Sequence, residues 1–549
     1  MKTAKGLQNC LFGFIFLLMA QTFVYGQTED SWFFFRAKDT LFNPQFDATG
    51  DYLTYTGNDN RLRQVLEDYK ISTFKKTYKG AKKEALKKTF FVIADRADLL
   101  DDLLRKAKHL FEYGALVPEE EKKIFEPNDY GLTSTIGENI GLQVNLDNYD
   151  FLGLPQAWYY TTGSRDIFIG ISDGQLDTTN IEFKGKTKQI KKSSFSNGHG
   201  VGQAVKAAGQ GDNGYGVPGI CYDCSLYGTA FGNLNSLQHL KDLSNLGAKV
   251  INCSWVGRTY YDHGQEAVNE IFENGTLVVA SAGNSDWGKT KGEVLYYPAS
   301  YDNVISVSTV MYKHENTLDN IQLGKTGKYY AENIRGTVGR TMGFKNNDTL
   351  SDPLIYHVST ATLNKEVDIL APTTGIFLME TYILSGEFAY HEYQTTSGAS
   401  PFVSGAIGLM FSLAPCLAVD EVESILKMTA TNIDHIKANK PFEGKYGAGM
   451  LHIGRAVKMV HDLYTEDETA VIENQNFSRW DFKLTSYSNE VVIKNQEFSK
   501  DATLNLRAKN KIVIGPNTVL RPNKKGNIHL KIDPTLTREC ELKLRKEKE

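Results

Sequence analysis

The sequence predicts an α/β domain with a mostly parallel central sheet, preceded by an α+β region and followed by a small all-β region. Between about 128 and 464, short β-branched runs bounded by glycine alternate with helical periods, which favours parallel strands. A charged break, VPEEEKKIFEPND, precedes this part. From about 465 to 549 the pattern changes to short strands with polar turns. These observations predict domains at 27–127, 128–464 and 465–549.

The first 26 residues have the pattern of a secretory signal peptide. Lys2 and Lys5 precede an apolar core at 11–20, and small residues stand before Gln27. We therefore expect cleavage before Gln27 and export to the cell envelope or the medium. No other stretch approaches the roughly 20 apolar residues of a membrane span. The net charge of −4 gives no electrostatic case for a nucleic-acid partner.

Six cysteines are present, and they favour disulfide chemistry in an oxidising compartment. Cys10 lies before the apolar core of the signal, so lipid anchoring is not expected. Cys221 and Cys224, in GICYDCSLYG, could close a small disulfide, and no second ligand pair for zinc stands nearby. Cys253 lies in the apolar run VINCSW and is expected to be buried.

Strands and helices follow from short sequence patterns. Segment 27–127 contains the helical NRLRQVLEDYKISTF, the strand-like TFFVIAD and the amphipathic DLLDDLLRKAKHLF. The strands expected in 128–464 are DIFIGISD, KVINCSW, TLVVASAG, NVISVSTV and VDILAP. Those expected in 465–549 are EVVIKN, ATLNLRA, KIVIGPNTVL and NIHLKID.

Residues 395–406, TTSGASPFVSGA, start a helix with small side chains where stronger helix formers would be expected. One interpretation is structural, because Ser and Thr cap helices and Pro is tolerated in the first turn. The other is chemical: at a helix N-terminus the hydroxyl of Ser397 faces free N–H groups, which suits a nucleophile beside an oxyanion site.

Three further residues stand at strand ends or helix starts. Asp173 follows the strand IFIGIS, His199 opens a helical period in SNGHGVGQAVKAAGQ, and Asn284 ends TLVVASAGN. Each by itself could be an ordinary turn or cap residue. Together with Ser397 they supply the orienting carboxylate, the base, the oxyanion donor and the nucleophile of acyl transfer, at the carboxyl edge of the sheet.

Several blocks, in order, resemble those of the subtilisin-like (subtilase) serine proteases. The resemblance spans about 157–457 and rests on IFIGISDGQLDTTNIEF, NGHGVGQAVKAAG, VINCSWVG, TLVVASAGNS and TTSGASPFVSGAIGLM. It implies a three-layer catalytic domain and a secreted serine endopeptidase that is made as a zymogen and acts on proteins or peptides through an acyl-enzyme.

The resemblance also implies residue roles. Ser397 would attack the scissile carbonyl, His199 would act as base and then acid, and Asp173 would hold the imidazole. Asn284 and the Ser397 N–H would bind the oxyanion. Substrate would be bound by Ser254, Trp255, Val256, Gly257 and Gly283.

Departures from the usual blocks indicate a divergent member. Val201 and Gly202 follow the histidine where the family has Thr and His, and Phe402 replaces another His. Trp255 and Val256 stand where Leu and Gly are usual. The alternatives are therefore a degenerate peptide-binding protein and an esterase with the same triad. Val256 would narrow the pocket for the residue before the cut.

The flanking segments and cofactors complete the expectations. Segment 27–127 resembles in position the propeptides that chaperone and inhibit such enzymes, so it would be an internal partner. The segment 465–549 resembles modules of secreted enzymes from Bacteroidota-like bacteria and is expected to be dispensable for cleavage. No cofactor is required. Calcium is common in similar enzymes, but no acidic loop is dense enough to assign its ligands.

Overall fold

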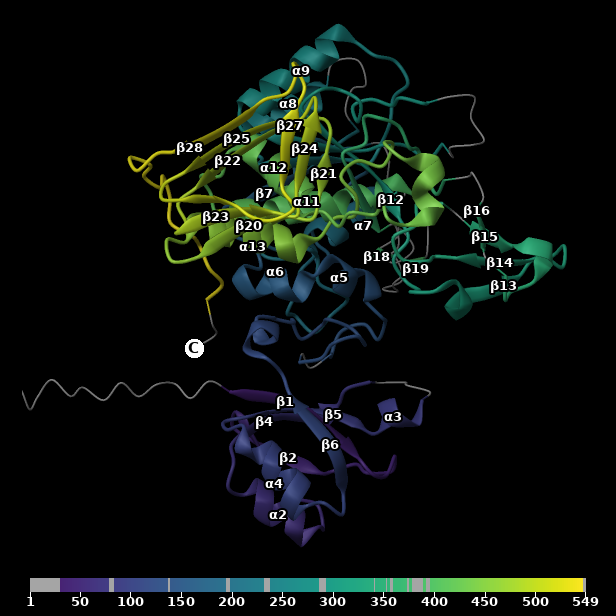
Figure 1. Ribbon diagram of the computed structural model, residues 1–549, viewed down its shortest axis with the longest axis vertical. Coiled ribbons are helices and arrows are strands. Elements are labelled where there is room, and N and C mark those ends of the chain that lie inside the picture. The colour runs from purple at the N-terminus through teal and green to yellow at the C-terminus, as the bar shows by residue number, and fades with distance from the viewer. Residues whose placement is uncertain are drawn as a thin grey trace, which may run out of the picture. The chain divides into compact units, whose positions relative to one another are not determined.

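The computed structural model describes residues 30–78, 83–136, 139–193, 198–231, 237–285, 293–339, 341–351, 353–355, 359–372, 375–377, 389–391 and 395–546 (Figure 1). Its contacts divide the chain into two compact units, 1–122 and 123–549. The predicted signal peptide, 1–26, lies outside the described residues. No helix in the described ranges has the length and apolar character needed to cross a bilayer.

The first unit is an antiparallel sheet with two main helices. Its elements are β1 (Ser31–Ala37), β2 (Phe46–Thr49), β3 (Tyr52–Tyr55), α2 (Asn60–Leu66), β4 (Ile71–Lys76), α3 (Glu84–Lys87), β5 (Thr89–Ala94), α4 (Asp98–Lys106), β6 (Phe111–Leu116) and η1 (Glu119–Lys122). The main sheet has the order β4-β5-β1-β6. Buried aromatic rings of β1, β5 and β6, among them Phe35, Phe90 and Phe111, form its core. The α+β expectation is confirmed, with more strand than the sequence indicated.

The second unit is built on a seven-stranded sheet in the order β17-β12-β11-β10-β7-β9-β8, in which every pair is parallel. The strands are β7 (Phe168–Ser172), β8 (Thr187–Gln189), β9 (Ser225–Thr229), β10 (Val250–Cys253), β11 (Leu277–Ser281), β12 (Val304–Val310) and β17 (Ile369–Pro372). All five strands expected in this part are in this sheet. The α/β class with a parallel sheet is therefore confirmed.

Helices cover both faces of this sheet. They are α5 (Asp147–Leu152), α6 (Leu154–Tyr160), α7 (His199–Ala208), α8 (Gln238–Asn245), α9 (Asp262–Glu273), α11 (Thr396–Leu413), α12 (Val419–Thr429) and α13 (Ile453–Tyr464). Val250 and Val279 face the core that contains α7 and α11. Their neighbours Ile251 and Val278 face the core that contains α8 and α9. Alternate side chains thus pack into opposite layers, which gives the three-layer arrangement.

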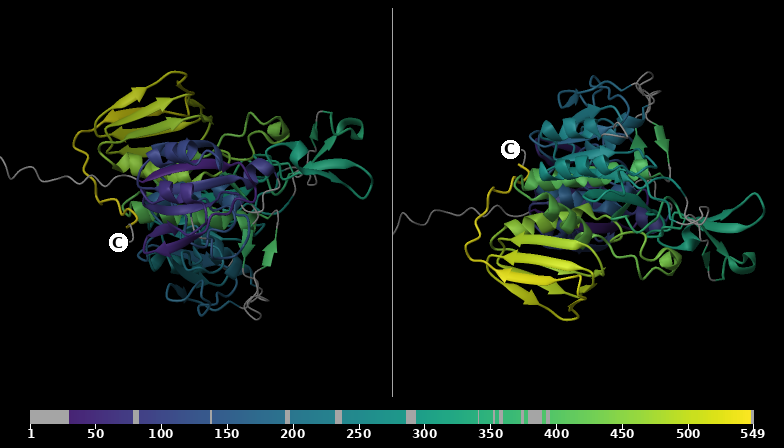
Figure 2. Two further views of the ribbon diagram at one scale, coloured as in Figure 1. Left: turned by 90° about the horizontal axis from the view of Figure 1, so that it is seen from below. Right: turned by 90° about the horizontal axis from the view of Figure 1, so that it is seen from above.

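A smaller antiparallel sheet projects from this domain to the right in Figure 1 and again in both views of Figure 2. It contains β13 (Ile321–Leu323), β14 (Tyr329–Glu332), β15 (Thr341–Phe344) and β16 (Pro353–Ile355). The remaining elements are β18 (Gly375–Phe377), which pairs with β19 (Ala389–His391), and the short helices η2 (Thr317–Asn320), η3 (Lys345–Asn347) and η4 (Lys437–Phe442). The sequence did not predict this sheet.

The C-terminal strands stack as three coils of a parallel β-helix, visible as the yellow strands in Figure 2. The strands are β20 (Thr469–Glu473), β21 (Asn476–Phe477), β22 (Asp481–Ser486), β23 (Glu490–Lys494), β24 (Glu497–Lys500), β25 (Thr503–Ala508), β26 (Ile512–Ile514), β27 (Val519–Pro522) and β28 (Ile528–Ile532). Like residues stack between coils, as Ile472 pairs with Ile493 and Phe477 with Phe498. The expected all-β character is confirmed.

The β-helix and the α/β domain share one hydrophobic core. Ile472 and Leu484 of the first coil belong to the same buried cluster as Val460 of α13. A disulfide joins Cys416, just after α11, to Cys540 beyond the last strand. The pairing of Cys221 with Cys224 is present as expected, and Cys253 is buried and free. The sequence did not predict the second disulfide.

Truncation after Tyr464 is therefore expected to destabilise the α/β domain. This differs from the expectation, drawn from the sequence, that 465–549 is dispensable. The cut exposes buried side chains of α12 and α13, at about 1.5–3 kcal/mol for each large apolar side chain, and a few of these equal a typical folding free energy. Thermal melts and hydrolysis of a small peptide would measure the effect. The full chain with both Cys416 and Cys540 changed to Ser is the control, and should lose only about 2–4 kcal/mol. An unchanged melting temperature after truncation would contradict this expectation.

Candidate active site

Asp173 and His199 form a hydrogen-bonded pair at the carboxyl end of β7. The Asp173 side chain is fully buried, and its Oδ1 accepts a hydrogen bond from the Gly174 N–H at 2.6 Å. His199 Nδ1 lies 2.8 Å from Asp173 Oδ1 and 3.0 Å from Oδ2. The His199 side chain is 34% exposed, so one edge of the imidazole meets the carboxylate while part of the ring faces solvent.

A close approach of two backbones fixes the position of this histidine. His199 is the first residue of α7, after Gly198 with a left-handed φ of 75°. A Cβ on Gly200 would lie 2.4 Å from the Gly174 carbonyl oxygen, which no real contact tolerates. The glycines on both sides of His199 therefore let the helix start directly on the loop that carries Asp173.

Ser397 lies in the first turn of α11, above a buried group of hydroxyls. Its Oγ donates to the Ser254 carbonyl oxygen at 3.2 Å. Ser254 Oγ in turn donates to the Ser397 carbonyl oxygen at 3.0 Å and lies 3.0 Å from Ser400 Oγ. A hydroxyl has one proton, so the Ser397 hydroxyl must turn away from the Ser254 carbonyl oxygen before another acceptor can receive that proton.

The strand register brings the two groups to one edge of the sheet. Cys253 pairs with Ser172, so Ser254 and Asp173 are the next residues on neighbouring parallel strands. Helices α7 and α11 also pack closely, since a Cβ on Gly405 would lie 2.8 Å from the Ala207 carbonyl oxygen. His199 and Ser397 each precede these contact residues by the same number of residues. The carboxyl edge predicted from the sequence is thus where these residues gather.

Asn284 is exposed and follows β11, and Thr396 holds its amide. Asn284 Oδ1 accepts from the Thr396 N–H at 2.9 Å and from the Thr396 hydroxyl at 3.1 Å. Thr396 Oγ1 also accepts from the Gly283 N–H at 3.1 Å. Within the described residues the Asn284 Nδ2 group makes no hydrogen bond, so its two protons remain available for a ligand oxygen. The sequence did not single out Thr396, although it stands next to Ser397.

The predicted substrate strand lies beside a small pocket. Trp255 is buried and its Nε1 donates to Ser172 Oγ at 3.2 Å, whereas Val256 is 37% exposed. Gly257 exchanges two main-chain hydrogen bonds with Tyr297, at 2.6 and 2.9 Å. No main-chain bond of Val256 occurs in the described part of the chain, so its N–H and carbonyl can pair with another strand. The pocket, of about 80 Å³, is lined by Leu237, Trp255, Gly257, Arg258, Thr259, Tyr261, Tyr297, Pro298 and Tyr301.

Two buried ionisable side chains lie in the segment after β7. Burial raises the pKa of Glu182 well above its usual range, and neither carboxylate oxygen has a hydrogen-bond partner among the described residues. Burial lowers the pKa of Lys186 to about 7, and its Nζ donates to the Tyr222 carbonyl oxygen at 2.6 Å. A single carboxyl falls short of the six to eight oxygen ligands that calcium takes, so Glu182 by itself does not assign a calcium site. The sequence did not identify Glu182.

Comparisons with known proteins identify the family of this chain. The model of the subtilase family matches residues 124–449, more than half of the chain and the part that contains every predicted site residue. Subtilisin DY of Bacillus licheniformis is 26% identical over 307 residues, which cover 53% of this chain and 91% of that protein. Thermitase of Thermoactinomyces vulgaris is 28% identical over 275 residues, 47% of this chain and 79% of that protein. The crystal structure of fervidolysin from Fervidobacterium pennivorans is 17% identical, covers 79% of this chain and 62% of that chain, and has a TM-score of 0.43.

Proposed function

This chain belongs to the subtilase family of serine proteases, and we propose that it is an exported endopeptidase with Asp173, His199 and Ser397 as its catalytic residues. The observation that carries the proposal is the buried Asp173 carboxylate hydrogen-bonded to His199 Nδ1, at the sheet edge where the first turn of α11 carries Ser397. This is the arrangement that acyl transfer needs: an oriented base beside a hydroxyl at a helix N-terminus.

The reaction uses these groups in two steps. Ser397 Oγ bonds to the scissile carbonyl carbon while His199 accepts the hydroxyl proton, and the C–N bond then breaks as His199 returns the proton to the leaving amine. Water hydrolyses the resulting ester by the same route. Asp173 holds the imidazole tautomer and stabilises its charged form. The Asn284 Nδ2 group and the Ser397 N–H stabilise the oxyanion.

The proposal includes a zymogen whose cut lies within 117–124. Strand β6 ends at Leu116, and most of the following segment is exposed. Beyond it, Phe125 N–H donates to the Pro155 carbonyl oxygen, and the buried Glu126 accepts from Ser134 Oγ at 2.9 Å. These contacts build 125 onward into the second unit, so the mature chain would begin before Phe125. Mass spectrometry of the secreted protein tests this N-terminus, and a start beyond Glu126 would contradict it.

One observation favours the non-catalytic alternative. The Ser397 hydroxyl donates to the Ser254 carbonyl oxygen, so its proton is already engaged within the protein. Fluorophosphonate labelling separates the possibilities, since a peptide-binding protein without an activated serine would not be labelled. Casein digestion then separates an endopeptidase from an esterase. We expect labelling at Ser397 and casein cleavage. The assignment to Bacteroidota-like bacteria stays a prediction.

Replacement of Val256 by Gly is expected to broaden specificity for the residue before the cut. An extended substrate would pair with the free main-chain groups of Val256, while its exposed isopropyl group reduces the room for a flat ring. We expect about a tenfold gain in kcat/KM for a Phe peptide relative to a matched Ala peptide, equivalent to about 1.4 kcal/mol. An unchanged ratio would mean that the Val256 side chain does not border the substrate residue before the cut.

A further inference from the structure

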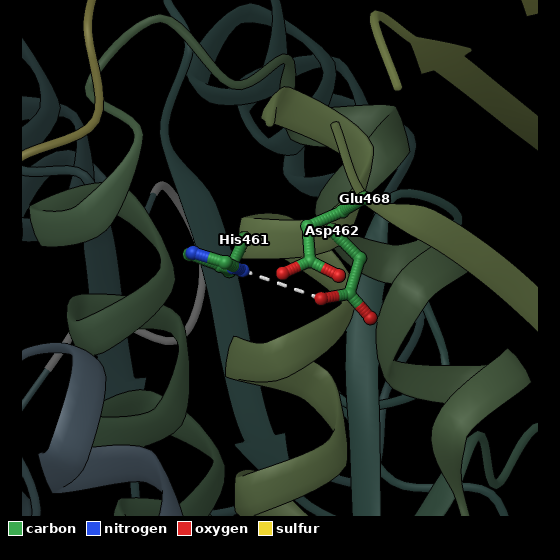
Figure 3. Close-up of side chains that lie close together, drawn as sticks. All are labelled: His461, Asp462 and Glu468. Atoms are coloured by element: carbon green, nitrogen blue, oxygen red, sulfur yellow. Dashed lines mark hydrogen bonds and ion pairs between the residues drawn. The ribbon is translucent and has the colours of Figure 1, made fainter. Parts of the chain in front are cut away.

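A histidine and two carboxylates meet at the end of α13, where the peptidase-like domain joins the β-helix. His461 and Asp462 are in the last turn of α13, and Glu468 directly precedes β20. Figure 3 shows the three side chains directed toward one another. One ligand atom of each lies within 4.8 Å of the other two. None of the three takes part in the proposed catalytic site.

The charges at this place are unbalanced. Lys458 pairs with Asp462 Oδ2, while Oδ1 lies 3.2 Å from His461 Nδ1. Glu466, two residues before Glu468, pairs with Lys509, but Glu468 has no ion pair among the described residues. Asp462 and Glu468 therefore place two carboxylates beside a single ammonium group, that of Lys458. The partial negative charge at the C-terminus of α13 adds to this excess of negative charge. A cation is the natural complement.

Neighbouring side chains hold the His461 ring in place. The His461 ring packs on Tyr160 with 4.7 Å between ring centroids, which limits its rotation. Asp462 and Lys458 also line a cavity of about 710 Å³ between α12, α13 and the β-helix.

We propose that His461, Asp462 and Glu468 bind a zinc ion that joins α13 to the β-helix. An imidazole nitrogen with two carboxylate oxygens is a ligand set that zinc accepts, with water in the fourth position. Tetrahedral bonds of about 2.1 Å place ligand atoms about 3.4 Å apart, so the 4.8 Å limit requires a small inward movement. The flexible Glu468 side chain can supply it. Lys458 holds Asp462 Oδ2 and leaves Oδ1 for the metal.

Zinc chloride titrated into the EDTA-treated full chain tests the proposal. We expect saturable binding of one ion per chain and, at 100 times the Kd, a rise in melting temperature of about 3 °C for a unit of this size. His461→Phe keeps the ring that packs on Tyr160 and removes the ligand nitrogen. Glu468→Gln keeps the side-chain shape. Each should weaken binding about 100-fold, whereas the neighbouring Glu466→Gln should bind as the unmodified protein does.

A wild-type protein without saturable binding, or ligand variants that bind as tightly as Glu466→Gln, would overturn the site. Melting curves without zinc should match among the variants, which separates ligand loss from misfolding. If a variant unfolds, chemical modification of the wild-type protein tests the site instead. Bound zinc should protect His461 from modification by diethyl pyrocarbonate. Equal modification of His461 with and without zinc would overturn the proposal.

Discussion

Replacement of Ser397 by alanine is expected to abolish peptide-bond hydrolysis and to leave the precursor uncut if maturation is autocatalytic. The change removes the attacking oxygen but keeps the helix start, because the Thr396 contacts to Asn284 and Gly283 do not involve the Ser397 side chain. The loss in kcat should be about 10⁶-fold, the scale known for this change in a subtilisin. Residual turnover above the uncatalysed rate would come from the oxyanion donors and substrate binding.

The measurement is steady-state hydrolysis of a chromogenic peptide, together with the mass of the secreted product. Ser412→Ala is the matched control, because it lies in the same helix and none of its hydroxyl contacts involves a proposed catalytic residue. The hydroxyl donates to the Gly408 carbonyl oxygen at 2.7 Å and lies 3.5 Å from Cys224 Sγ and 3.9 Å from Cys221 Sγ. That variant should remain active and processed. Full activity of Ser397→Ala would refute the nucleophile assignment, and an inactive Ser412→Ala would show that α11 itself is disturbed.

The central sheet could be predicted from the sequence because buried parallel strands are continuous apolar runs. All four residues of β10, from Val250 to Cys253, are buried, and such runs stand out between glycines. The edge strand β8 reads TKQ and gave no such signal. Of the β-helix strands, β23 and β25 to β28 were predicted, whereas those of the first coil and β24 were not. Their stacking was also missed, although paired residues recur at a nearly constant spacing, as Thr469 with Glu490 and Val491 with Ile512, and this repeat was not recognised in the sequence.

The pair of Asp173 and His199 could be predicted because each is a chemically distinctive residue at the end of one element, Asp173 after β7 and His199 at the start of α7. Thr396 was missed because its role depends on Asn284, 112 residues away, which no local pattern connects to it. The Cys416–Cys540 disulfide was missed for the same reason, with 124 residues between its cysteines. Long-range partners of this kind are set by the topology, which brings the ends of β11 and the start of α11 together.

Replacement of Asn284 by alanine is expected to lower kcat with little change in KM. The Asn284 oxygen is held by Thr396, which leaves the Nδ2 group as the donor for an oxyanion that exists only in and near the transition state. A donor of this kind contributes little to ground-state binding. The expected loss is about 10²–10³-fold in kcat, the range known for removal of such a donor in a subtilisin.

Two further variants distinguish a donor from a turn residue. Asn284→Asp keeps an oxygen for the Thr396 N–H and hydroxyl but replaces the donor with a negative oxygen, so it should be at least as inactive as the alanine variant. Thr396→Ser keeps the hydroxyl that holds the amide and should retain most of the activity. Steady-state kinetics on one peptide compares all three. A change confined to KM, or an active Asn284→Asp enzyme, would mean that the amide group shapes the end of β11 and does not meet the developing charge.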